Sequence, residues 1–576
     1  MKLLKKLICC GVAVMTMIST LSGCNLINGG GTQVSDDKIS ALTYTKPVRI
    51  ADMQTWHSEI RTESTNSSSK TKKNNAPTEN GLVVCPYYTL KVNGKSVPIY
   101  TTRCSESPHS YAWIDVDGAP ETFTLDVELT TVKEYKYVVV LPEKSGVTAE
   151  LKEKTVKAQI KAYGDYSFAF AANGDKYPTV KNEPLTLMVA PQEKLTVPEG
   201  YDVQTFTPQT YGYDDLVCEN DNTVYVFKAG EYDIRRIHVN KRKNVMFYFE
   251  PGTYISVYET PTIGLDEYDI AGPVFGIHNS ENVEIRGRAL FDFSAVRGWF
   301  KKPDGTDQDM TQYVFNFYKN KDMYISGITT INSNHWTFRI CGCEDVLAEW
   351  NMMLGYRNYS DGFIYSDCKN CTARNMFART GDDGIEVKAL GWHGWWDPSV
   401  KVASNIVFEK CTVWNDDAAA FGVIYENYEA VDGVIFRDCS VGFTSCAWSS
   451  NNSSLNVRLT YPGTAHWKNI TFDGFEIYET KSNVFTLEWH LKGGSVENLL
   501  VKNITVTRKT SGFAGIRLCV NTDNLLKPAD MASVCKNVVF ENINFRGKVM
   551  TEADKDNSIM CSFAPTIGYK DVYTIK

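Results

Sequence analysis

The nonapeptide NITFDGFEI, residues 469–477, decides the fold because variants of it recur through the second half of the chain. Each variant begins with Asn or Gly and then places small or apolar residues in two alternating pairs. Within 469–477 the first pair is Ile470 with Phe472, and the second is Phe475 with Ile477. The extra residue between the pairs reverses the alternation, as a sharp corner between two short strands would. The other copies are NIVFEKCTV (405–413), GVIFRDCSV (433–441), NLLVKNITV (498–506), NVVFENINF (537–545) and, more weakly, NCTARNMFA (370–378).

The spacing of these copies, 28 to 39 residues, indicates coils of variable length built around a constant strand–corner–strand unit. Weaker copies start at Asn282, Asp322 and Asp345. A coil cannot bury its apolar residues alone, so coils that repeat this corner should stack into a right-handed parallel β-helix. Cys411 and Cys439 occupy the same position of their repeats. Their side chains should therefore point inward and stack from one coil to the next. Cysteines on core positions, with no second ligand pair at zinc spacing, predict no metal site.

Composition divides the chain ahead of these repeats. Residues 48–204 are rich in Thr, Val and Tyr and carry turn sequences such as VNGK, DVDGAP and AANGDKYP. Runs such as TFTLDVELTTV alternate with period two, which indicates an antiparallel sandwich. The expected fold is therefore all-β, with an N-terminal β-sandwich followed by a right-handed parallel β-helix over residues 205–576.

The first 24 residues, MKLLKKLICCGVAVMTMISTLSGC, have the order of a secretory signal: three lysines, an apolar run and small residues. The apolar run, 7–21, is too short to span a bilayer comfortably. The last four residues resemble a bacterial lipobox, which implies a signal peptide over 1–23 and a lipidated thiol on Cys24. A plain signal peptide cut elsewhere is the alternative. Residues 24–47 then predict a flexible tether, and the expected location is the extracellular face of a bacterial membrane, lipid-anchored.

The net charge of −8 argues against two classes of partner. It becomes more negative once the lysines of the leader are removed. A negative protein gains no electrostatic help in binding nucleic acid or a strongly anionic polymer. The sixteen cysteines, three of them in the first 24 residues, do not form the framework of a small disulfide-rich protein.

Two adjacent carboxylates begin a strand-like stretch in RTGDDGIEVK, residues 379–388. Neighbouring residues of a strand point to opposite faces, so Asp382 and Asp383 form either a solvated turn or a reactive pair. Asp361 precedes Asp382 by 21 residues, slightly less than one coil, so all three aspartates can converge on one outer face. Clustered carboxylates raise at least one pKa, and a proton donor beside ionised partners is what glycosidic cleavage needs. Calcium binding is the alternative, because three aspartates supply hard oxygen ligands.

The stretch that contains these aspartates, residues 331–389, resembles the centre of the β-helical glycoside hydrolases of families 28 and 49. These are the polygalacturonase and the dextranase/isopullulanase families. The resemblance extends to VFKAGEYDI…MFYFEPGTYI (226–255) and NVEIRGRALFD (282–292), and it covers about residues 220 to 480.

This resemblance implies a polysaccharide substrate, no cofactor and a role for each aspartate. Asp382 would be the general acid that protonates the leaving oxygen, whereas Asp361 and Asp383 would hold and deprotonate the attacking water. Both families invert configuration at the anomeric carbon, so room for the water should separate acid and base.

Two departures from the polygalacturonase pattern bear on the substrate. No histidine occurs in DAAAFGVIYENYEAVDGVIF (417–436), where that family carries Gly-His-Gly. In RLT (458–460) Arg458 remains from an Arg-Ile-Lys motif, but Thr460 replaces the lysine. These losses argue against a uronic acid and favour the resemblance to family 49, which acts on neutral glucans and carries a β-sandwich ahead of its β-helix.

Several further residues are candidates for substrate binding. Tryptophans in ALGWHGWWDPS (389–399) suit stacking on sugar faces, although such a loop could equally pack its own aromatic rings. The predicted substrate-binding residues are Trp392, Trp395, Trp396, Lys388, Glu426 and Arg458. A pectin hydrolase, a polysaccharide lyase and a non-catalytic carbohydrate-binding β-helix protein remain as alternatives.

Overall fold

The computed structural model describes most of the chain downstream of residue 31. The described ranges are 32–58, 78–120, 122–258, 273–296, 300–301, 307–308, 314–357, 359–391, 402–424, 427–445, 453–459, 466–489, 494–509, 515–520, 535–557, 561–564 and 572–576.

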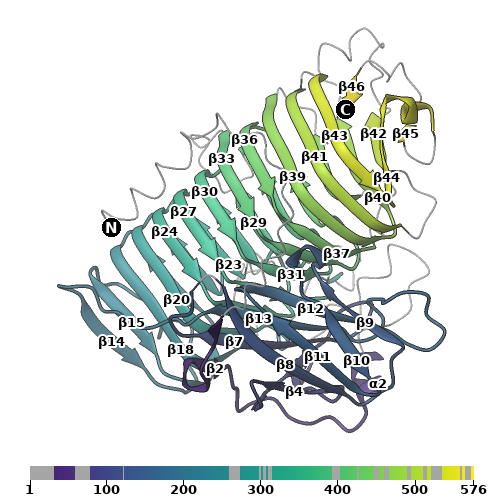
Figure 1. The fold of residues 1–576 in the computed structure, drawn as a ribbon. Helices are drawn as coiled ribbons and strands as arrows, with labels where there is room; N and C mark the ends of the chain where they lie inside the picture. Colours follow the sequence, from purple (N-terminus) through teal and green to yellow (C-terminus); the bar gives the residue numbers. More distant parts are fainter. Residues whose placement is uncertain are drawn as a thin grey trace.

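The N-terminal part consists of two β-sheets packed face to face (Figure 1). One sheet has the order β10 (Ala149–Lys152), β11 (Thr155–Ile160), β8 (Phe123–Thr131), β4 (Tyr88–Val92) and β5 (Lys95–Val97), with β1 (Thr32–Gln33) on β8. The other has the order β3 (Leu82–Val84), β6 (Tyr100–Thr102), β7 (His109–Val116), β13 (Leu185–Pro191), β12 (Gly164–Ala171) and β9 (Tyr137–Leu141), with β2 (Ile39–Ala41) on β7. A short helix, α2 (Met53–Ser58), and two 3-10 turns, η1 (Asp36–Lys38) and η2 (Glu143–Ser145), accompany them.

The apolar residues that alternate along the strands meet between these sheets. Leu125 and Val127 of β8 face Ile114 of β7 and Leu187 of β13 in one buried cluster. The strands β1 and β2 lie within the range 24–47, for which we predicted a tether. Because both are paired with strands of the sandwich, the chain from residue 32 onward is not a free tether.

The rest of the chain winds into a right-handed parallel β-helix. An 11-stranded sheet lines one side: β17 (Ile237–Asn240), β19 (Phe275–His278), β23 (Phe315–Tyr318), β26 (Phe338–Cys341), β29 (Phe363–Ser366), β32 (Ile385–Lys388), β35 (Phe421–Val423), β38 (Ser453–Leu459), β40 (Asn483–Trp489), β42 (Ile516–Val520) and β45 (Cys561–Ala564).

A 20-stranded sheet, bent at the corners, forms the other sides. Its strands are β14 (Asp202–Phe206), β15 (Thr223–Phe227), β16 (Gly230–Ile234), β18 (Lys243–Val257), β20 (Glu281–Asp292), β24 (Lys321–Ser326), β25 (Ile328–Ile331), β27 (Glu344–Glu349), β28 (Met352–Leu354), β30 (Lys369–Arg374), β31 (Phe377–Thr380), β33 (Val402–Glu409), β34 (Thr412–Asn415), β36 (Ala430–Arg437), β37 (Ser440–Thr444), β39 (His466–Thr480), β41 (Ser495–Lys509), β43 (Cys535–Phe545), β44 (Lys548–Val549) and β46 (Tyr573–Ile575). The pair β21 (Phe300–Lys301) and β22 (Asp307–Gln308) and the 3-10 turn η4 (Glu552–Asp556) lie outside both sheets.

The Asn or Gly at the start of each repeat takes a left-handed backbone conformation. Asn469, Asn498 and Asn537 have φ angles of 58°, 57° and 52°, and Gly433 has 78°. Gly and Asn tolerate this conformation better than other residues, which explains the pattern in the sequence. The asparagines also bond from coil to coil: the Nδ2 of Asn498 donates to the Oδ1 of Asn469 over 3.0 Å, and the Nδ2 of Asn537 donates to the Oδ1 of Asn498 over 2.9 Å.

Five residues after that start, a second left-handed residue makes the predicted corner. Gly474 has a φ of 76°, and Asn503 and Asn542 have 54° and 53° at the same position of their coils. The strand therefore turns here and its next apolar pair again points inward, toward the core.

Stacked side chains fill the interior of the β-helix. The rings of Phe408 and Phe436 lie 5.0 Å apart, and those of Phe436 and Phe472 lie 4.7 Å apart, both nearly parallel. Cys411 and Cys439 are fully buried in the same cluster, as the predicted inward stacking required. The predicted fold class, a β-sandwich followed by a right-handed parallel β-helix, is confirmed.

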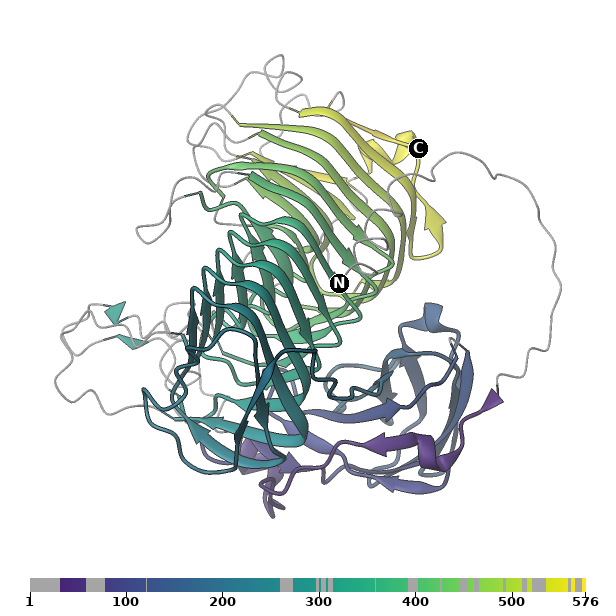
Figure 2. The same ribbon diagram turned by 90° about the vertical axis from the view of Figure 1, so that its left-hand side faces the viewer.

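The sandwich lies against one flank of the β-helix (Figure 2). Trp113 and Tyr111 of β7 belong to one buried cluster with Trp350, Phe377 and Trp414 of the coils. The two parts are thus joined by a common hydrophobic core rather than by a hinge. The strand β14 pairs with β15 and crosses the boundary predicted at residues 204–205.

Within the described residues, no helix has the length and apolar character required to cross a membrane. The predicted signal peptide and Cys24 lie outside these residues.

Candidate active site

The three aspartates lie where two neighbouring coils enter the 11-stranded sheet. Asp361 precedes β29, and Asp382 and Asp383 precede β32. The main chains of these coils are hydrogen-bonded at this point, since the N–H of Gly362 donates to the carbonyl of Asp383 over 2.9 Å. Asp361 and Asp383 therefore occupy the same row of adjacent coils, which agrees with the spacing in the sequence.

The main chain holds the carboxylate of Asp382 at both oxygens. Its Oδ2 accepts the N–H of Tyr359 over 3.0 Å, and its Oδ1 accepts the N–H of Asp383, also over 3.0 Å. The hydroxyl of Thr380 donates to the Asp382 carbonyl over 2.8 Å, and the amide of Asn415 donates to the same carbonyl. The side chain is therefore fixed in orientation although it stands in a turn.

Glycines on either side of the aspartate pair allow this close approach of coils. A Cβ on Gly381 would lie 2.6 Å from the carbonyl oxygen of Arg357. A Cβ on Gly384 would lie 2.5 Å from the carbonyl oxygen of Ala420. No real Cβ tolerates such distances, so the bend that presents Asp382 and Asp383 requires glycine at both places.

Glu386 joins two of the aspartates in a buried group that was not predicted. Carboxylate oxygens of Asp361, Asp383 and Glu386 all lie within 4.8 Å of one another, and Asp382 is not a member of this group. Asp383 is fixed by the N–H of Ala419, which donates to its Oδ1 over 3.0 Å. Glu386 is fully buried on the outer face of β32. Its position three residues after Asp383, at an outward place of the strand, was the available signal in the sequence.

Burial and mutual repulsion raise the pKa values of three of these carboxyls. Burial and then the charge of Asp383 raise the pKa of Asp382 to about 7. Asp417, which was also missed in the sequence, adds to that repulsion. Burial, followed by the charges of Asp382 and Glu386, holds the pKa of Asp361 well above its usual range. Burial also raises the pKa of Glu386 to about 8, although Lys388 opposes the shift.

Lys388 lies beside this group but is only 3% exposed. Its Nζ is 3.3 Å from the Oε1 of Glu386 and 4.8 Å from the ring centre of Trp336. Three clustered carboxylates are hard ligands of the kind that calcium takes. Here the ammonium group of Lys388 already supplies a positive charge to the cluster.

Arg458, the second predicted cation, is paired with a carboxylate of the next coil. Its Nε and Nη2 lie 2.7 Å and 2.6 Å from the Oε2 of Glu488, and both side chains are buried. The outer face of β38 carries Asn456 and Arg458, two residues apart, while Thr460 lies outside the described residues. The two predicted cations, Lys388 and Arg458, thus each face a glutamate, whereas Arg339 of β26, in the same outward row as Glu386, lies 5.1 Å from the ring centre of Trp336.

A buried ion pair connects the aspartate turn to the sandwich. Arg379, at the end of β31, lies 3.2 Å from Asp416, and both side chains are fully buried. Asp416 also accepts the N–H of Ser105 over 3.0 Å, and Arg379 lies 3.1 Å from the Nδ1 of His109. The sandwich therefore supports the strand that leads into Asp382.

Four predicted substrate-binding residues, Trp392, Trp395, Trp396 and Glu426, lie outside the described residues.

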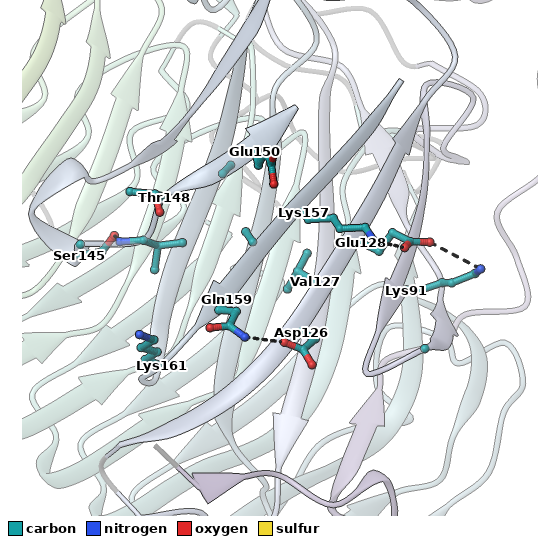
Figure 3. A pocket seen from close by; sticks show the side chains of 15 residues that line it. Lys91, Asp126, Val127, Glu128, Ser145, Thr148, Glu150, Lys157, Gln159 and Lys161 are labelled. Carbon is teal, nitrogen blue, oxygen red and sulfur yellow. Dashed lines mark hydrogen bonds and ion pairs between the residues drawn. The ribbon is translucent and has the colours of Figure 1, made fainter. Parts of the chain in front are cut away.

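A separate hollow of about 710 Å³ lies on the sandwich (Figure 3), and its lining includes none of Asp361, Asp382 and Asp383. Three of its charged side chains are paired with one another: Lys91 and Lys157 lie 3.7 Å and 3.6 Å from Glu128. Among the described residues, no aromatic side chain lines it. It contributes nothing to the carboxylate site.

Comparison with known proteins identifies the family. The sequence model described as glycosyl hydrolases family 28 matches residues 243–562. No curated protein sequence matches the chain significantly. The solved structure of Dex49A from Penicillium minioluteum is similar at 11% identity, with 95% of this chain and 100% of that chain covered and a TM-score of 0.57. An exopolygalacturonase from Thermotoga maritima is similar at 13% identity, with 62% of this chain and 89% of that chain covered and a TM-score of 0.44.

The two kinds of comparison bear on different properties. The likeness to Dex49A extends over the sandwich as well as the coils, and at this identity it concerns the fold alone. The family model spans more than half of the chain and includes all three aspartates. The chain belongs to family 28 of the glycosyl hydrolases and is a glycoside hydrolase with a parallel β-helix fold.

Proposed function

We propose that this glycoside hydrolase inverts configuration, with Asp382 as its general acid. The carrying observation is that main-chain N–H groups hold both oxygens of Asp382, whose pKa is raised to about 7, beside the group formed by Asp361, Asp383 and Glu386. A carboxyl with this pKa retains its proton near neutral pH and can give it to a leaving oxygen. Inverting enzymes need such a donor on one side of the scissile bond and a base with a water molecule on the other.

The attacking water would sit at the group that contains Asp361 and Asp383. Asp361, whose pKa is well above its usual range, would hold the water as a neutral carboxyl, and Asp383 would take the proton. The water oxygen bonds to the anomeric carbon from one face. The bond from that carbon to the glycosidic oxygen breaks on the other face, and that oxygen receives the proton of Asp382. Mutation of Asp382 tests this assignment directly, as described in the Discussion.

We propose further that the substrate is a neutral α-glucan. Binding of a uronate needs cations that are free to pair with its carboxylate, and the two predicted cations, Lys388 and Arg458, each lie against a buried glutamate. The net charge of −8 also gives the protein no general attraction for an anionic polymer. Pectic substrates are the second candidate, because the family model that matches the chain is that of family 28.

A screen of four polymers distinguishes these substrates. We expect purified residues 25–576 to release reducing ends from dextran or pullulan and not from polygalacturonate or xylan. The matching Asp382→Asn protein, purified in the same way, controls for contaminating hydrolases. Hydrolysis of polygalacturonate alone would overturn the neutral glucan, and products absorbing near 235 nm would indicate a lyase instead.

We propose that the protein is anchored to the extracellular face of a bacterial membrane through Cys24. The support is the lipobox-like sequence at residues 21–24. A single acyl chain binds a membrane only marginally, so stable anchoring requires the several chains of a lipoprotein. We expect the wild-type protein in the detergent phase after phase separation, and Cys24→Ser in the soluble fraction or unprocessed. Recovery of intact wild-type protein entirely from the culture medium would contradict the anchor.

A further inference from the structure

Tyr359 is an exposed aromatic residue at the edge of the carboxylate site. It lies two residues before Asp361, and its side chain is 43% exposed although most large apolar residues of the coils are buried. Its main-chain N–H is the group that donates to the Oδ2 of Asp382 over 3.0 Å. Tyr359 thus carries the exposed ring on its side chain and holds the carboxylate of Asp382 with its main chain.

The backbone of Tyr359 is in the left-handed region, with a φ of 62°. A bulky residue is uncommon there, because its Cβ crowds the main chain. At the corners of the coils most residues with this conformation are asparagine or glycine, for which the conformation is less strained. Strain of this kind persists at sites where the side chain is needed for another reason.

A second ring gives Tyr359 a rigid backing. The ring of His335 lies parallel to it at 5.9 Å between centroids and 7° between planes. His335 is 8% exposed, and its Nδ1 accepts the N–H of Trp336 over 2.8 Å. Burial lowers the pKa of His335 to about 3, so its imidazole is neutral and presents a flat, uncharged face. Tyr359 therefore stands as a supported platform and not as a freely rotating side chain.

We infer that Tyr359 is a sugar-binding platform, on whose ring the pyranose at the leaving-group side of the scissile bond stacks. The inference rests on the proposed function of Asp382, since the platform is placed by its bond to that residue. The C–H face of a pyranose is apolar and flat enough to pack on an aromatic ring, while its hydroxyls remain at the rim. An aromatic contact also suits a neutral sugar, because such a sugar has no charge with which to pair with the lysine and arginine of the site.

The test compares three variants on the polymer that the wild type hydrolyses in the four-polymer screen. Tyr359→Ala should raise KM roughly tenfold, the effect of about 1.4 kcal/mol of lost stacking, and change kcat much less. The main-chain N–H that holds Asp382 is retained in every variant. Tyr359→Phe keeps the ring and should stay within about twofold of wild-type KM. Tyr213→Ala is the matched control, because Tyr213 is 40% exposed but packs under Arg236 in the first coils.

A fourth variant separates binding from a merely structural role. Tyr359→Gly removes the ring and relieves the left-handed backbone, so we expect Tm to hold or rise while KM rises as in Tyr359→Ala. A lower Tm with unchanged KM would show that the ring is structural and would overturn the inference. Unchanged KM in Tyr359→Ala, with Asp382→Asn inactive, would contradict the sugar-binding role of Tyr359. It would not contradict the proposed function of Asp382. If the wild type hydrolyses none of the polymers, the proposed function fails and the platform fails with it.

Discussion

Replacing Asp382 with Asn is expected to lower kcat by about 10²- to 10⁴-fold, the usual contribution of general acid catalysis. The amide cannot donate a proton to the leaving oxygen with any comparable strength. Its geometry is otherwise preserved, because one oxygen remains to accept a main-chain N–H. The other N–H loses its acceptor, so we expect only about 1 kcal/mol of lost stability. Initial rates of reducing-end release measure the effect on kcat.

The pH dependence of the wild type provides an internal check on this assignment. Asp382 acts in its protonated form, and its pKa is about 7, so activity should fall as the pH rises through 7. In Asp382→Asn that alkaline limb should be absent from any residual activity. Asp345→Asn is the matched control, since Asp345 stands at a left-handed corner where other coils carry asparagine. Wild-type turnover in a folded Asp382→Asn protein would disprove the acid role.

Replacing Asp416 with Ala is expected to destabilise the protein by about 3–5 kcal/mol, because it leaves a buried arginine without its counter-ion. Arg379 and Asp416 are both fully buried, and Asp416 also accepts the N–H of Ser105 from the sandwich. The midpoint of urea unfolding, with an unchanged slope, measures the loss. Activity should fall as well, since Asp416 lies in the segment whose Ala419 N–H holds Asp383.

Two further variants set the scale for that loss. Glu150→Ala removes an exposed ion pair with Lys152, whose side chain is 80% exposed, and should cost less than about 1 kcal/mol. The double variant Arg379→Met with Asp416→Leu removes both charges and should recover most of the stability. A cost for Asp416→Ala no larger than that for Glu150→Ala would contradict the supporting role of the buried pair.

The sequence predicted those features of this protein that depend on short-range patterns. The corner in 469–477 follows from alternation alone, and the left-handed asparagines show why each repeat starts as it does. The convergence of Asp361 with Asp383 also followed, because a spacing of nearly one coil places both in adjacent layers.

Features that depend on the register between coils could not be predicted from the sequence. Arg458 meets Glu488 thirty residues later, and only the pairing of β38 with β40 reveals that its charge is neutralised. Glu386 looked like an ordinary solvent-facing residue of an alternating strand, yet it is fully buried. The strands β1 and β2 are too short and too polar to stand out from a linker, and their partners in the sandwich hold them in place.

The hydrophobic cluster common to sandwich and coils limits how this architecture can diversify. Trp350, Phe377 and Trp414 project from three successive coils into the surface of β7 and its neighbours. A catalytic solenoid transplanted without that sheet would present a broad apolar flank to water and become prone to aggregation. Recombination can therefore exchange outer loops, or add coils beyond the cluster, more readily than it can exchange one part for a foreign counterpart. The two parts are constrained to be inherited as one unit.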